Sequence, residues 1–157
     1  MADRPDPTRV VADADVLAAD LLVGDAARDA LDLIRSHSWM TLVASESLID
    51  DAEAVIATLA TPDVAGDWRE KIESFATIVT HPSGDHPALA ATLHGRAARV
   101  LTFDESLTSA RAGVTIRQHV ATSLTSPDAF VATFNPESLY ASAREGDYPG
   151  PDRNPRA

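Results

Sequence analysis

The stretch TLVASESLIDDAEAVIATLATP, residues 41–62, contains the clearest pairing of a strand with a helix in this chain. Residues 41–44 form a short apolar run of the kind found in buried strands. Ser45 can cap a helix, and Pro62 ends it. Between them the apolar residues recur at the spacing of one buried helix face, namely Leu48, Ile49, Ala52, Val55, Ile56 and Leu59. This stretch therefore predicts a strand that is followed directly by a helix.

The same alternation continues in both directions from this stretch. Residues 9–12 are a short β-branched run, and two helical patterns follow at 15–23 and 25–36, with Gly24 between them. Further strands are expected at 76–80, 99–103 and 114–117, and further helices around Trp68, Ile72 and Phe75 and at 87–97, 105–112 and 127–134. Short strands that alternate with helices favour a parallel sheet covered by helices on both faces, so the expected fold class is α/β.

Length and composition predict one globular domain at 9–141. The chain has 157 residues with a hydrophobic fraction of 45%, and a domain usually contains roughly 100 to 200 residues. The proline-containing residues 1–8 and the Pro-, Gly- and charge-rich residues 142–157 are expected to remain unpacked, as a disordered start and a flexible tail. Because neither a signal-peptide pattern nor a membrane-spanning run is found, we expect a cytoplasmic location.

The charge balance is strongly acidic and almost free of lysine. The chain has 24 acidic and 13 basic residues, which gives a formal net charge of -11, and Lys71 is its one lysine. This balance resembles that of proteins from salt-in halophiles, in which molar salt screens the repulsion between surface charges. An ordinary acidic protein is the alternative. With no cysteine in the chain, any metal must be held by oxygen or imidazole ligands.

Acidic residues follow two of the expected strands. Asp13 ends the first, with Asp15 two residues further on, and Asp104 ends the fourth, beside Thr102 and Glu105. In open parallel sheets, ligands bind at the carboxyl ends of the strands. We therefore expect the carboxylates of Asp13 and Asp104 to meet at one edge of the sheet.

Two further acidic positions are candidates for the same edge. Asp85 stands at the start of the helix that leads into the fourth strand, and Asp51, with Asp50 as its rival, lies in the helix after the second strand. Carboxylates that are brought together repel one another, and a divalent cation removes that repulsion. A bound Mg²⁺ or Mn²⁺ lowers the pKa of water and neutralises charge on a phosphodiester, so this pattern favours metal-assisted hydrolysis.

These motifs and their order resemble the PIN domain, a family of metal-dependent ribonucleases that includes the toxins of many toxin-antitoxin pairs. VVADADVL supplies Asp13, SESLIDDAEAVI aligns Asp51 with the family's glutamate, and DHPALAATLHGRAARVLTFDESL supplies Asp85 and Asp104. The resemblance covers residues 9–132. It implies a three-layer α/β/α fold, one or two Mg²⁺ or Mn²⁺ ions, and RNA as the substrate. The expected partners are RNA, an antitoxin protein and, in a homodimer, a second copy of the chain.

The chain departs from the family pattern at two positions. Asp51 is one methylene shorter than the expected glutamate, so it would reach a metal from closer range or through water. Asp15 stands where the family has Asn, Ser or Thr, and it adds a negative charge. Asp15, Thr102 and Glu105 are therefore auxiliary candidates. The catalytic candidates are Asp13, Asp51, Asp85 and Asp104, of which Asp13, Asp85 and Asp104 are the expected metal ligands.

Other interpretations remain open at this point. Asp85 and Asp104 could serve as helix N-caps, and Asp51 could belong to a solvated helix face. A catalytically silent PIN-like module that binds RNA or protein would share the same motifs. A haloacid-dehalogenase-like phosphatase also begins with Asp-x-Asp after a strand, but it requires a late lysine that this chain lacks. The histidines are interpreted as surface residues, with His86 as a candidate for the site, and Trp68 and Phe75 as core residues.

Overall fold

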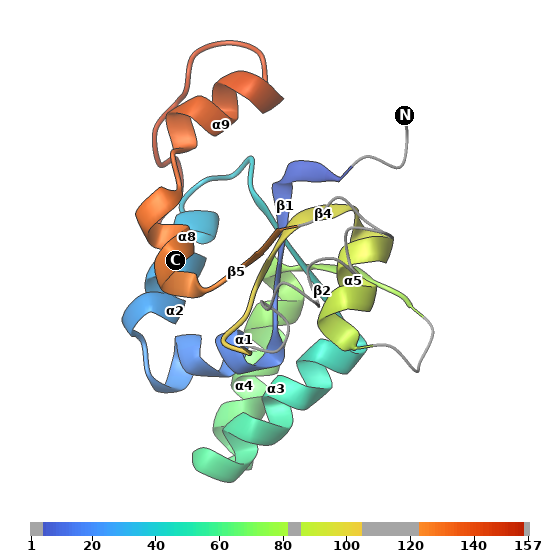
Figure 1. Cartoon of the computed structure of the whole chain (residues 1–157). Helices are drawn as coiled ribbons and strands as arrows, with labels where there is room; N and C mark the ends of the chain where they lie inside the picture. The colour runs from blue at the N-terminus through green and yellow to red at the C-terminus, as the bar shows by residue number, and fades with distance from the viewer. Residues whose placement is uncertain (1–4, 82–85, 105–122, 156–157) are drawn as a thin grey trace.

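The computed structural model describes residues 5–81, 86–104 and 123–155. Its sheet has five strands, all parallel, in the order β3-β2-β1-β4-β5 (Figure 1). The strands are β1 (Asp6–Ala12), β2 (Thr41–Ser45), β3 (Thr77–Val79), β4 (Ala97–Leu101) and β5 (Ser123–Thr125). The predicted α/β class with a parallel central sheet is confirmed. Because every strand runs in the same direction, all the carboxyl ends lie along one edge.

Helices connect and cover these strands. In the described ranges they are α1 (Ala14–Leu22), α2 (Asp25–Arg35), α3 (Glu46–Leu59), α4 (Pro62–Phe75), α5 (Pro87–Gly95), α8 (Pro127–Thr133) and α9 (Pro136–Ala143). Several begin at a side chain that accepts a hydrogen bond from the first turn, as predicted for Ser45, whose hydroxyl accepts from the Leu48 amide at 3.3 Å. Gly24 separates α1 from α2, with φ at +87°, a conformation that favours glycine.

Alternate residues of each central strand face two separate hydrophobic clusters, which gives the molecule three layers. Val10, Leu42 and Leu101 belong to the larger cluster with side chains of α1, α2, α3, α4 and α8. Their neighbours Val11, Val43 and Val100 belong to the smaller cluster, with α5 and Leu48. Figure 1 shows α5 on one side of the sheet and α2 and α8 on the other. None of the helices in the described ranges combines the length and apolar character that a membrane span needs.

Some element boundaries differ from the sequence prediction. The fourth strand ends at Leu101 rather than at residue 103, so Asp104 follows it at a distance of three residues. The N-cap of α5 is His86, whose ring nitrogen accepts from the Ala88 amide at 3.2 Å. Strand β5 and helix α9 were not predicted. The expected helix at 105–112 and strand at 114–117 lie outside the described residues.

Both chain ends pack more than the sequence suggested. Strand β1 begins at Asp6 rather than at residue 9. The segment expected to be a free tail contacts the body of the protein as far as it is described. The hydroxyl of Tyr148 is hydrogen-bonded to a ring nitrogen of His37 at 2.6 Å, and the carboxylate of Asp152 accepts a hydrogen bond from the Ser38 amide at 2.7 Å. The expectation of an unpacked tail is therefore wrong for this segment.

His37 explains why this segment packs. It is 1% exposed rather than a surface residue, and its ring lies 5.7 Å from that of Tyr148 and 5.4 Å from that of Trp39. Its other ring nitrogen is 2.7 Å from the carbonyl of Leu33. A buried imidazole needs partners for both nitrogens, and the tail supplies one of them through Tyr148.

Candidate functional site

Asp13 occupies the junction between β1 and α1 at the carboxyl edge of the sheet. Its amide donates to the carbonyl of Leu101 in β4 at 2.9 Å, and its Oδ1 accepts from the Ala14 amide at 2.8 Å. Its Oδ2 accepts from the hydroxyl of Thr102 at 2.9 Å. Asp13 is 7% exposed, so these contacts hold a nearly buried carboxylate in one orientation.

Thr102 joins the ends of three neighbouring strands. It is fully buried, its hydroxyl donates to Asp13 after β1, and its amide donates to the carbonyl of Thr125 at the end of β5 at 3.1 Å. The same hydroxyl oxygen accepts from the amide of Asp104 at 3.0 Å. The structure therefore brings Asp13, Thr102 and Asp104 together, which is the arrangement that the strand ends predicted.

Asp15 lies at the same edge and is affected by both other carboxylates. Its Oδ2 accepts from the Phe103 amide at 3.2 Å. Burial and the nearby charge of Asp13 raise the pKa of Asp15, and Asp104 adds to that rise, whereas the amides of Phe103 and Val16 oppose it. A raised carboxyl pKa means that negative charge is unfavourable here, and a bound cation would reverse that preference.

One histidine lies beside this carboxylate cluster, and another lies at the end of β2. His86 Nε2 lies 4.0 Å from Asp13 Oδ2, a contact that becomes an ion pair when the imidazole is protonated. His81 follows β3, and its Nε2 is 2.9 Å from the hydroxyl of Ser45 at the end of β2. The sequence indicated His86 as a candidate but took His81 for a surface residue. The signal for His81 is its place directly after the strand that pairs with β2.

The two acidic candidates in α3 differ in their surroundings. Asp50 accepts from Arg69 of α4 at 2.7 Å, and that guanidinium also contacts Glu53 at 2.9 Å. Asp51 is exposed and lies three residues after Leu48, whose side chain belongs to the cluster beneath α5. Asp50 is therefore turned to α4, which leaves Asp51 as the α3 carboxylate on the α5 side.

The described part of the site does not make a complete metal centre. In residues 5–81, 86–104 and 123–155, no three histidine or acidic side chains are placed so that they could hold a metal ion together. Asp85 and Glu105, two of the predicted contributors, lie outside these residues. What the described residues provide is an edge with three carboxylates, Asp13, Asp15 and Asp104, whose oxygens are the donors that Mg²⁺ and Mn²⁺ prefer.

Comparisons with known proteins identify a family without a described activity. No curated protein and no solved structure matches the chain. One family model does match, over residues 4–156, and its description is a family of unknown function, DUF7384. Since the match extends over nearly the whole chain, from before β1 to the end of the packed C-terminal segment, this protein belongs to the DUF7384 family.

Proposed function

We propose that this protein is a PIN-type ribonuclease that depends on Mg²⁺ or Mn²⁺ and cleaves RNA phosphodiesters. The observation that carries the proposal is the Asp13–Thr102–Asp104 connection, in which one buried hydroxyl binds the first carboxylate and the backbone of the last. Asp85 would be the third ligand and Asp51 an accessory carboxylate. This set follows the motif order that resembles the PIN domain.

Residues of this chain would orient the metal-binding carboxylate and supply negative charge to the site. Thr102 and the Ala14 amide fix the two oxygens of Asp13, so this carboxylate loses little side-chain freedom when a cation binds. Asp15 adds charge where the pKa rise shows that charge is unfavourable without a cation. A bound Mg²⁺ or Mn²⁺ would supply Lewis-acid stabilisation of the charge that develops on the phosphodiester.

A silent RNA- or protein-binding module with the same fold is the second candidate. It is favoured by the fact that both oxygens of Asp13 already accept hydrogen bonds from the protein. A second observation also favours it: Asp51 is exposed, and it stands where the PIN pattern has the longer glutamate. A phosphatase of the haloacid-dehalogenase type is not favoured, because the one lysine, Lys71, lies on α4 rather than at the carboxyl edge.

The test is calorimetric titration of Mn²⁺ into chelator-treated protein in molar KCl. We expect stoichiometric binding by the parent and none by Asp13→Asn/Asp104→Asn. The matched control is Asp29→Asn/Asp67→Asn, which removes the same charge from exposed positions on α2 and α4 and should bind Mn²⁺ normally. Circular dichroism of each variant verifies the fold.

The same proteins then decide between the two candidates. Cleavage of a mixed-sequence single-stranded RNA by the parent, lost with chelator and in the double variant, supports the ribonuclease. Mn²⁺ binding without any cleavage supports the silent module. Mn²⁺ binding that survives in Asp13→Asn/Asp104→Asn would overturn the assignment of these ligands.

A further inference from the structure

A second polar site lies away from the carboxyl edge. It is a cavity of about 670 Å³ between the end of α1, α2, the second half of α4 and the C-terminal segment. Asp20 and Leu21, in the last turn of α1, form part of its wall, whereas Asp13 caps the opposite end of the same helix. The cavity is therefore distinct from the proposed ribonuclease site.

The charge of this cavity is opposite to that of the chain. Its lining includes four cationic side chains, Arg28, Arg35, Lys71 and Arg153, and one carboxylate, Asp20, for a formal charge of +3. The chain as a whole has a formal charge of -11. Basic residues make up about a twelfth of the sequence but a third of this lining. Cations concentrated in a concave surface attract anions.

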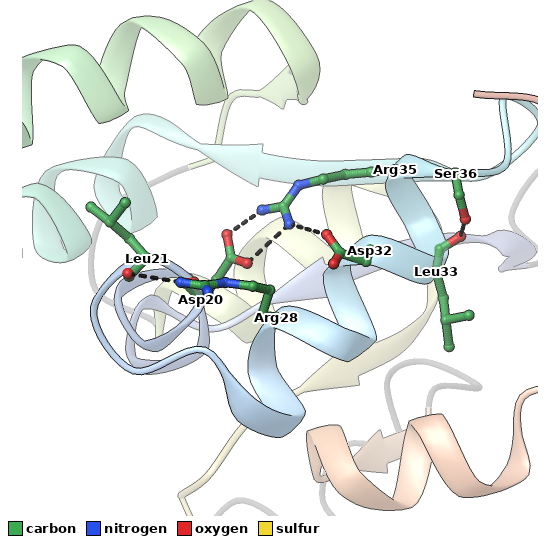
Figure 2. Close-up of polar contacts among 7 residues, drawn as sticks. All are labelled: Asp20, Leu21, Arg28, Asp32, Leu33, Arg35 and Ser36. Atoms are coloured by element: carbon green, nitrogen blue, oxygen red, sulfur yellow. Dashed lines mark hydrogen bonds and ion pairs between the residues drawn. The ribbon is translucent and has the colours of Figure 1, made fainter. Parts of the chain in front are cut away.

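One of these cations is already neutralised. Arg35 forms a two-pronged ion pair with Asp20, whose side chain is 8% exposed, and it also contacts Asp32 at 2.8 Å (Figure 2). This arrangement satisfies the one carboxylate in the lining. The charge that remains for a ligand is that of Arg28, Lys71 and Arg153.

Arg28 is held in place without losing its charge. Its Nε donates to the carbonyl of Asp20 at 3.0 Å and its NH2 to that of Leu21 at 3.1 Å, as Figure 2 shows. The guanidinium folds back over Gly24, where an added Cβ would lie 3.1 Å from NH1. Carbonyl contacts orient the group but do not neutralise it. In the described part of the chain, no carboxylate forms an ion pair with Arg28, Lys71 or Arg153.

Three large apolar side chains of the lining come from α4. Trp68, Ile72 and Phe75 follow one another along its inner face, and Phe75 is half-buried. The guanidinium of Arg153 lies 5.6 Å from the centre of the Phe75 ring, and it donates to the carbonyl of His37 at 3.2 Å. The packed C-terminal segment thus brings a cation next to an aromatic side chain, a combination that suits a ligand with an anionic and an apolar part.

We propose that this cavity binds a small organic phosphate of about nucleotide size. Its volume falls within the range of about 300 to 1,000 Å³ that is usual for small-molecule sites. A phosphate monoester carries a charge of about -1.5 to -2 at neutral pH, so it offsets the charge of Arg28, Lys71 and Arg153 better than a single carboxylate does. Arg28, Lys71 and Arg153 hold the phosphate, and the α4 wall contacts the apolar part. This proposal does not depend on the proposed ribonuclease activity.

The test is thermal unfolding of the full chain with each of the four ribonucleoside 5′-monophosphates, with the parent nucleosides, and with inorganic phosphate. We expect at least one monophosphate to raise the Tm of the parent and its nucleoside to leave it unchanged. In Lys71→Gln/Arg153→Gln the rise should disappear, and titration calorimetry should show affinity reduced at least tenfold. Chelator is present throughout, so the carboxylate site does not contribute.

Two further variants keep this test decisive. Arg99→Gln/Arg144→Gln removes the same charge outside the cavity lining and should respond like the parent. Lys71→Gln alone changes an exposed side chain and retains the Arg153 contact with His37, so it keeps a folded protein available if the double variant unfolds. The proposal is overturned if no monophosphate stabilises the parent, or if the stabilisation persists equally in Lys71→Gln and in the double variant.

Discussion

At the scale of single residues, Thr102 connects three strand ends at the carboxyl edge. It is fully buried, and its hydroxyl is shared between Asp13 Oδ2 and the amide of Asp104. A buried hydroxyl is unfavourable unless it is hydrogen-bonded, and here both its donor and its acceptor roles are used. Thr102 therefore links the side chain of Asp13 to the backbone of Asp104.

Thr102→Val tests that dependence. Valine has nearly the same shape but no hydroxyl, so one oxygen of Asp13 and the amide of Asp104 lose their partner. We expect the free energy of unfolding to fall by about 1–3 kcal/mol in chemical denaturation, and Mn²⁺ affinity to fall with it. Thr58→Val is the control, since Thr58 is exposed and donates only to the Ala54 carbonyl within α3. Equal stability of the two variants would contradict this account.

At the scale of elements, α5 approaches the sheet closely just before β4, the strand that Asp104 follows. Gly95 ends α5, and a Cβ added there would lie 2.5 Å from Cγ1 of Val43 in β2. Any larger residue would push the helix away from the strand. Gly66, in α4, has no atom within 4 Å of its added Cβ.

Gly95→Ala and Gly66→Ala form a matched pair with opposite expected outcomes. Gly95→Ala should destabilise the protein by about 1–3 kcal/mol, because a methyl group is forced into a packed interface. Gly66→Ala should stabilise it by about 0.5–1 kcal/mol, since alanine favours helix and restricts the unfolded chain. Denaturant unfolding measures both, and in Gly95→Ala/Val43→Ala the two effects should be less than additive. A Gly95→Ala protein as stable as the parent would contradict the close approach.

At the scale of the whole molecule, charge repulsion competes with local ion pairs. The formal net charge of -11 favours repulsion between surface carboxylates. Ion pairs oppose it, and the single guanidinium of Arg69 lies within ion-pair distance of four carboxylates, those of Glu46, Asp50, Glu53 and Glu73. Added salt weakens both kinds of interaction. Because acidic residues outnumber basic ones by 24 to 13, we expect the loss of repulsion to have the larger effect.

Raising KCl from about 0.1 M to about 1 M, which shortens the Debye length from about 10 Å to about 3 Å, should therefore raise the Tm at neutral pH. We expect a rise of several degrees, since about 1 kcal/mol moves the Tm of a chain this size by roughly 2–4 °C. Near pH 4.6, the isoelectric point, the net charge vanishes and the salt effect should shrink. A Tm that falls with KCl at neutral pH would show that the ion pairs of Arg69 and Arg35 dominate.

Local patterns account for most of the predicted fold. The Ser45 cap and the break at Gly24 depend on residues within one helical turn, and both predictions are confirmed. The predicted apolar face of α3 is confirmed for Leu48, Ile49, Ala52 and Ile56, whereas Val55 and Leu59 are exposed. Strand β5, with the sequence SLT, has no apolar run, and its extended form depends on pairing with β4. The packing of the C-terminal segment was likewise missed, because its partner His37 is more than 100 residues away in sequence.

The sequence by itself determined the parallel α/β class and the placement of Asp13 and Asp104 at one edge of the sheet, because strand and helix periods are local and parallel strands end on one edge. Only the tertiary structure decided that Thr102 bridges these two residues, that Asp50 is turned to Arg69, and that four cations share one cavity. The contacts of Thr102 with Asp13 and of Asp50 with Arg69, like the cavity, join segments that lie apart in the sequence. Their geometry depends on strand register and helix packing, which no local pattern specifies.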